Sequence, residues 1–175
     1  RADASEPFAE AVADELQGLG MGEGEFRVEV GERELGPSGR DSVAFLVRPN
    51  PGLPFAPAAE TASGGELSRI ALALRAVAHA SAGEPTVVFD EIDAGIGGQT
   101  AHAVADALRR LGERAQILTI THLPQIASAA EAHLRVEKVP GDPTHTRIAR
   151  LSEAERREEL ERMLGGAEFL STFRR

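Results

Sequence analysis

Thr86-Val87-Val88-Phe89-Asp90-Glu91 joins a short apolar, β-branched run directly to a pair of acids. A run of this kind is typical of a strand that is buried on both faces of a parallel sheet. Ligands bind at the carboxyl ends of such strands, so the sequence predicts a site at Asp90 and Glu91. One carboxylate could hold Mg²⁺, and the other could orient or deprotonate an attacking water. On these residues alone, it is equally open that the acids only cap the next turn.

Helices and strands alternate around this run. A helix is expected after Ser63, another over residues 99–111, and a second buried strand over residues 117–120. The first helix is expected to bury one face: Leu67, Ile70, Ala71, Leu74 and Val77. The second is expected to bury Val104, Leu108 and Leu111. Because strands that alternate with crossover helices pair in parallel, the fold class is α/β, with a largely parallel sheet flanked by helices.

The N-terminal part follows other patterns. An apolar stripe at spacings of four, four and three predicts a helix that ends at Gly20 and Gly22: Phe8, Val12, Leu16 and Leu19. Alternating segments at residues 26–30 and 43–47 flank a turn at residues 36–39 and predict a small antiparallel β element. A proline-rich surface loop is expected over residues 49–57.

The C-terminal part predicts edge strands at residues 134–139 and 145–151, around the Gly141-Asp142-Pro143 turn. Ser152 follows them and is expected to cap a final charged helix. Glu155 stands in the capping-box position of that helix, which strengthens the assignment.

Ser63-Gly64-Gly65-Glu66 opens the helix expected after Ser63. Glycines let backbone N–H groups approach a phosphate, and the start of a helix carries partial positive charge, so the tetrapeptide could be an anion cradle. The alternative is a plain N-cap after a loop. On the tetrapeptide alone, the plain N-cap is the favoured interpretation.

Further polar groups are expected at the same edge of the sheet. The glycine-rich residues 92–98 do not complete a dinucleotide fingerprint, because Thr100 replaces its third glycine. They are better interpreted as a flexible loop that places Asp93 near the preceding acids. His122 follows the second buried strand and could hydrogen-bond a γ-phosphate, although a lone histidine is more often structural.

The lysine-bearing phosphate loop that normally accompanies such motifs is absent, because Lys138 is the only lysine and has the wrong neighbours. The net charge of −9 should repel nucleic acid, so a DNA contact would need a local basic patch or another part of a larger protein. No apolar run approaches the roughly 18 residues that span a bilayer. Zero cysteines fit a reducing, cytoplasmic environment.

These motifs together resemble the ABC-type ATPases. Ser63–Glu66 is similar to their signature motif, and residues 86–91 are similar to the Walker B strand with its glutamate. Asp93 falls in the D-loop, and His122 matches the switch histidine. The signature variant with Glu66, continued by Leu67-Ser68-Arg69, resembles the SMC-like ATPases, and the longer motifs resemble the RecN family of bacterial DNA repair proteins.

The resemblance implies the C-terminal half of an ATPase head that sandwiches ATP between two heads. Asp90 would hold Mg²⁺, Glu91 would polarise the attacking water and His122 would sense the γ-phosphate. The segment Ser63–Glu66 would bind the γ-phosphate from the opposite head, and Asp93 would couple the sites.

The resemblance also implies an organisation and a set of partners. Residues 1–24 would end a returning coiled-coil helix, and residues 25–175 would form the C-terminal lobe of the head. The partners would be the N-terminal lobe with its Walker A motif, a second head, and DNA through the full-length protein, with no membrane. The location would be cytoplasmic and nucleoid-associated. The alternatives are another SMC-like or ABC-type ATPase, a non-catalytic tether, and an unrelated α/β domain.

Overall fold

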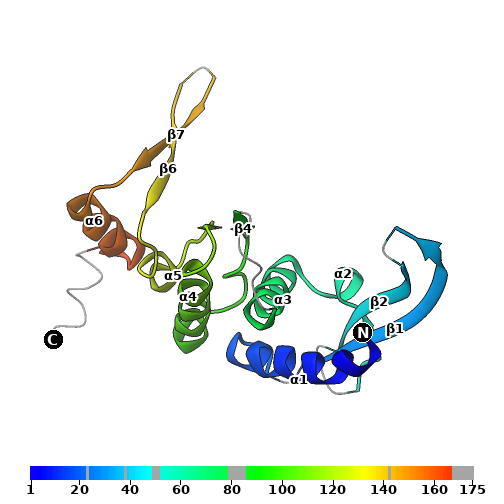
Figure 1. Cartoon of the computed structure of the whole chain (residues 1–175). Coiled ribbons are helices and arrows are strands. Elements are labelled where there is room, and N and C mark those ends of the chain that lie inside the picture. The colour runs from blue at the N-terminus through cyan, green and yellow to red at the C-terminus, as the bar shows by residue number, and fades with distance from the viewer. Residues whose placement is uncertain (23, 38, 49–51, 79–85, 142, 167–175) are drawn as a thin grey trace. The chain divides into compact units, whose positions relative to one another are not determined.

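The computed structural model describes residues 1–22, 24–37, 39–48, 52–78, 86–141 and 143–166. It divides into two compact units, Arg1–Ile120 and Thr121–Arg175. The first unit contains the following helices and strands, most of them labelled in Figure 1: α1 (Ala2–Gly18), β1 (Glu25–Gly36), β2 (Gly39–Arg48), β3 (Ala56–Pro57), α2 (Ala58–Thr61), α3 (Gly64–Val77), β4 (Val87–Phe89), α4 (Gly98–Gly112) and β5 (Ile117–Thr119). Within the described residues, no helix combines the length and apolar character needed to cross a membrane.

The first helix has the apolar stripe that the sequence predicts. Val12, Leu16 and Leu19 are at most 3% exposed, and α1 packs against β1 and α3. Gly20 follows the helix with a φ of +81°, a conformation that favours glycine. A Cβ at Gly20 would lie 2.6 Å from Cγ2 of Thr100, so glycine also permits close contact with α4.

An antiparallel sheet of order β1-β2-β3 confirms the β element expected in this region. Phe26 pairs with Val47 and Val30 with Val43. The loop expectation for residues 49–57 is wrong at its end, because β3 pairs antiparallel with β2. Proline has no backbone N–H to donate, so it is tolerated mainly on edge strands. β3 is such an edge strand, and Pro57 is therefore compatible with it. Residues 49–51 of the expected loop and Ser38 of the expected turn lie outside the described residues.

The helix α3 is buried on more of its circumference than the sequence predicts. Of the residues predicted for the buried face, Ile70 is buried, Leu67, Leu74 and Val77 are half-buried, and Ala71 is exposed. Leu72 and Ala73 are fully buried, which the sequence did not predict. The physical reason is that α3 contacts α1 as well as α4, so a single apolar face is not enough. In α4 the expected residues Val104, Leu108 and Leu111 are all buried.

Strands β4 and β5 form the parallel pair expected from their sequences, with Val88 opposite Leu118 and Phe89 opposite Thr119. The α/β class is therefore confirmed, although the parallel part has only this pair among the described strands. The expectation of burial on both faces is wrong. Phe89 is 2% exposed, whereas Val88, Leu118 and Ile120 are 46–60% exposed. Successive side chains alternate between the faces of a sheet, and within the described residues only one face is covered.

The second unit contains α5 (Pro124–Ala127), β6 (Leu134–Val139), β7 (His145–Arg150) and α6 (Glu153–Met163). The expected strands β6 and β7 pair antiparallel with each other, but they form a sheet of their own rather than edges of the parallel sheet. Their turn includes Asp142, which lies outside the described residues. Ser152 and Glu155 form the expected capping box of α6.

A pair of leucine substitutions tests how the first unit is packed. Leu72→Ala removes a side chain that is 0% exposed and should lower the free energy of unfolding by about 2–5 kcal/mol. Leu118→Ala removes one that is 46% exposed and should cost less than half as much. Urea unfolding of both variants measures the difference. Equal losses would contradict the exposure of the β4–β5 face.

Candidate functional site

The start of α3 is closed by a capping box between Ser63 and Glu66. The Ser63 hydroxyl accepts from the Glu66 N–H at 3.4 Å. Oε2 of Glu66 accepts from the Ser63 N–H at 2.7 Å and from its hydroxyl at 2.8 Å. The hydrogen bond from the Ser63 backbone is the main cause that lowers the pKa of Glu66. Ser63 is thus the N-cap of the helix, a carboxylate lies at the positive end of the helix, and the anion cradle stays a prediction.

Gly64 and Gly65 occupy the first positions of the helix, where N–H groups find no acceptor within the helix itself. Gly65 is buried, and a Cβ there would lie 2.9 Å from the carbonyl oxygen of Glu91 and 2.9 Å from Cβ of Ala94. A Cβ at Gly64 would instead lie 2.5 Å from the carboxylate oxygen Oε2 of Glu91. The two glycines therefore bring the start of α3 against the turn that follows β4.

Asp90 and Glu91 lie at the carboxyl end of β4, as the sequence predicts, and both are exposed. The Glu91 N–H donates to Oδ1 of Asp90 at 2.9 Å. Glu91 has a φ of +56°, the only positive value recorded for a described residue other than glycine. Such a conformation is costly for a side chain with a Cβ and persists only where the surroundings hold it.

Asp93 is 4% exposed, within a turn that is tied by hydrogen bonds on several sides. The Ala94 N–H donates to the Glu91 carbonyl at 2.9 Å, and the Ile96 N–H donates to the Asp93 carbonyl at 3.3 Å. Asp93 thus lies near the preceding acids, as expected, but in a hydrogen-bonded turn rather than a loosely held loop.

Arg69 is a site residue to which the sequence pattern assigned no role. Its side chain is 5% exposed, and its Nη1 donates to the carbonyls of Ile92 at 3.2 Å and Ala94 at 3.0 Å. Burial lowers the pKa of Arg69, and the Glu66 charge opposes this effect. The neighbouring Ser68 hydroxyl donates to the Asp90 carbonyl at 2.7 Å. In the sequence, Arg69 is marked only by its place in the continued signature Leu67-Ser68-Arg69.

His122 belongs to the second unit and is exposed, whereas the other predicted site residues belong to the first. Its neighbour Thr121 accepts a hydrogen bond from the Leu123 N–H through Oγ1, at 3.0 Å. The placement of His122 at the same edge as the acids stays a prediction.

Among the described residues, no group of three or more acidic, histidine or cysteine side chains could hold a metal ion. Mg²⁺ usually keeps several waters and binds through one or two carboxylates and the phosphates of a nucleotide, so it does not need such a group. The exposed Asp90 carboxylate at the strand end is a suitable ligand of this kind.

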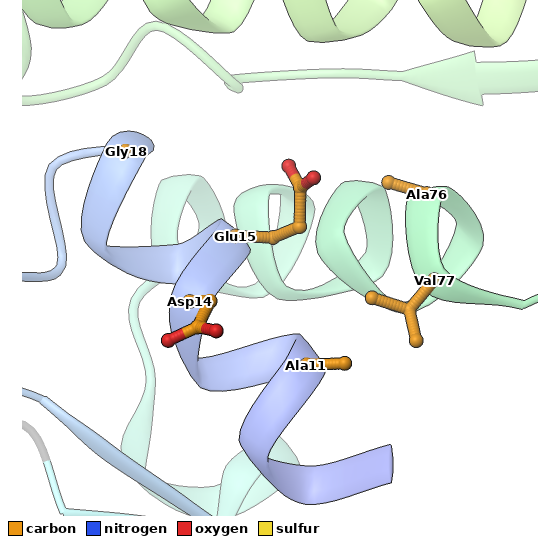
Figure 2. Close-up of a pocket in the computed structure, with 6 residues that line it drawn as sticks. All are labelled: Ala11, Asp14, Glu15, Gly18, Ala76 and Val77. Carbon is orange, nitrogen blue, oxygen red and sulfur yellow. The ribbon is translucent and has the colours of Figure 1, made fainter. Parts of the chain in front are cut away.

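A pocket of about 560 Å³ lies between α1 and α3, and Figure 2 shows the side chains around it. It is lined by Ala11, Asp14, Glu15, Gly18, Ala76 and Val77. The α3 residues belong to the C-terminal end of that helix, opposite to Ser63. Acidic side chains disfavour a phosphate, so we do not assign this pocket to the site.

Comparison with known proteins identifies relatives along most of the chain. It is 43% identical to DNA repair protein RecN of Streptomyces coelicolor, over 99% of this chain and 33% of that protein. The chain resembles RecN. It is also 46% identical to the RecN of Xylella fastidiosa (strain 9a5c), over 85% of this chain and 27% of that protein. The RecN-like chain thus spans about a third or less of these relatives, and no protein-family model matches it.

Solved structures agree with the resemblance to RecN at the level of the fold. An Smc head domain from Pyrococcus yayanosii matches 90% of this chain with a TM-score of 0.62 and 24% identity, over 29% of its own length. A second chain, from a study of ATP-driven dimerization of SMC ATPases, matches 90% of this chain and 91% of its own length, with a TM-score of 0.54 and 18% identity. The RecN-like chain therefore has the fold of part of an SMC head.

The two signature glycines give a matched test of the contact between α3 and the turn. Gly65→Ala must displace backbone atoms and should lower the free energy of unfolding by about 1–3 kcal/mol. Gly64→Ala meets only the end of the exposed Glu91 side chain, so its effect should stay within about 1 kcal/mol. Urea unfolding measures the free energy of unfolding of both variants. A Gly65→Ala variant as stable as the unchanged chain would contradict the close contact.

Proposed function

We propose that this chain is the C-terminal lobe of an ATP-hydrolysing, SMC-like head that acts in DNA double-strand break repair and recombination. Residues 1–24 would end the returning coiled-coil helix, and residues 25–175 would form the lobe. The observation that carries the proposal is the meeting of the α3 start with the acids after β4, in a chain that resembles DNA repair protein RecN.

In this proposal each acid of the turn has its own role. Asp90 holds Mg²⁺, which neutralises charge on the phosphates when it is bound. Glu91 accepts a hydrogen bond from the attacking water and orients it, and its exposed carboxylate can turn away from Gly64 to do so. His122 donates a hydrogen bond to the γ-phosphate of the same head.

The start of α3 would serve the nucleotide of the opposite head. The N–H groups of Gly64 and Gly65 would donate to the γ-phosphate, and so would the Ser63 hydroxyl once its proton turns away from Oε2 of Glu66. Glu66 keeps Ser63 in place through the capping box, and Asp93 couples the sites across the interface. Loss of the γ-phosphate would remove these contacts, so hydrolysis would favour separation of the heads and thereby control DNA tethering.

The proposal also names the partners that this chain would need. Lys138 is its only lysine and does not belong to a phosphate loop, so hydrolysis would need an N-terminal lobe with the Walker A motif. A second head would complete an ATP-bridged dimer. With a net charge of −9, this chain would meet DNA through other parts of the full-length protein. The protein would work in the cytoplasm, at the nucleoid.

Hydrolysis of ATP with Mg²⁺ tests the proposal directly, for this chain alone and after mixing with the N-terminal lobe. We expect activity only in the mixture. Glu91→Gln should lower kcat by about 10²-fold or more, because the carboxylate that orients the water is lost, while ATP-bridged dimers persist. Activity of this chain alone, or full activity of Glu91→Gln, would refute the proposed roles.

Substitutions in the two capping boxes can distinguish a role of Ser63 in binding from its role in folding. Ser63→Ala should lower the free energy of unfolding by about 1 kcal/mol and also weaken the ATP-bridged dimer. Ser152→Ala removes the same kind of cap from α6, far from any signature residue in the sequence, and is the matched control. Light scattering with ATP measures dimer formation. Equal dimer formation by both variants would leave Ser63 with a structural role only.

A further inference from the structure

The strained backbone of Glu91 is held from both sides by consecutive residues of α3. On the N-terminal side, the Ser68 hydroxyl donates to the carbonyl of Asp90. On the C-terminal side, the Arg69 guanidinium donates to the carbonyls of Ile92 and Ala94. A residue with a φ of +56° needs such restraint, since little in the local sequence favours that conformation.

The same guanidinium lies on the helix that begins with the signature residues. Arg69 stands three residues after Glu66, whose charge acts on it, and Glu66 bonds both the N–H and the hydroxyl of Ser63. Hydrogen bonds join Arg69 to the carbonyls that flank Asp93, whereas Glu66 acts on Arg69 only through its charge. Arg69 is 5% exposed, so water competes little for its bonds to these carbonyls.

We infer that Arg69 is a positioning residue, which holds Glu91 and Asp93 in place for hydrolysis. This inference rests on the proposed function. Arg69 acts only through backbone carbonyls of the turn and does not itself touch the nucleotide. A planar guanidinium suits this task, because one charged group donates to both carbonyls in a fixed geometry.

The test uses the full-length protein with three substitutions. Arg69→Met keeps an unbranched, mostly apolar side chain but removes the donors, and Arg69→Lys keeps the charge and part of the donors. Leu72→Ala lies on the same helix at a fully buried position and is the control for loss of stability. For each variant, kcat and KM for ATP are measured at a temperature where the variant stays folded.

We expect Arg69→Met to lower kcat by about tenfold to a hundredfold, as misplacement of catalytic groups by about 1 Å does. KM should stay within about twofold, Arg69→Lys should recover part of kcat, and Leu72→Ala should keep kcat near that of the unchanged protein. An Arg69→Met kcat within twofold of the unchanged value would overturn the inference. So would an equal loss of kcat in Leu72→Ala, because Arg69 would then only stabilise the fold.

Hydrogen exchange separates this inference from the proposed function. The N–H groups of Ala94 and Ile96 are bonded within the turn, so Arg69→Met should speed their exchange by about tenfold, whether or not the protein hydrolyses ATP. If the unchanged protein lacks ATPase activity, the proposed function fails. If Arg69→Met leaves the exchange of the Ala94 and Ile96 N–H groups unchanged, Arg69 does not hold the turn, and the inference fails separately.

Discussion

The close contact between the start of α3 and the turn after β4 is the constraint on which the site depends. Gly65 permits it, because any Cβ would lie 2.9 Å from the Glu91 carbonyl oxygen. Ser68 and Arg69 then bond the carbonyls of the turn. Segments that are more than 20 residues apart in the chain are thereby joined, and the acids of one motif lie beside the glycines of another.

The charges at this contact follow the polarity of the helix. The start of α3 carries partial positive charge, and the carboxylates of Glu66 and Glu91 both lie there. The positive charge of Arg69 lies deeper, where its Nη1 donates to two carbonyl oxygens. The first turn of α3 thus holds negative groups at the positive end of the helix.

Local signals predicted the elements of the fold well, but not what covers them. The caps at Ser63 and Ser152 are set by hydrogen bonds within four consecutive residues, so sequence reasoning found both. The burial of β4 and β5 was predicted wrongly, since an apolar run shows that a face could be covered, not that it is. Val88 and Leu118 stay exposed because the described residues cover only the opposite face.

The sequence by itself determined the class of fold, the order of the elements and the positions of Asp90 and Glu91 at a strand end. These features depend on periodicity and on short-range hydrogen bonds, which neighbouring residues specify. The tertiary structure alone decided the burial of Arg69, the positive φ of Glu91 and the approach of Glu91 to Gly64. Each of these arises from packing between segments distant in the chain, and no local pattern encodes such packing.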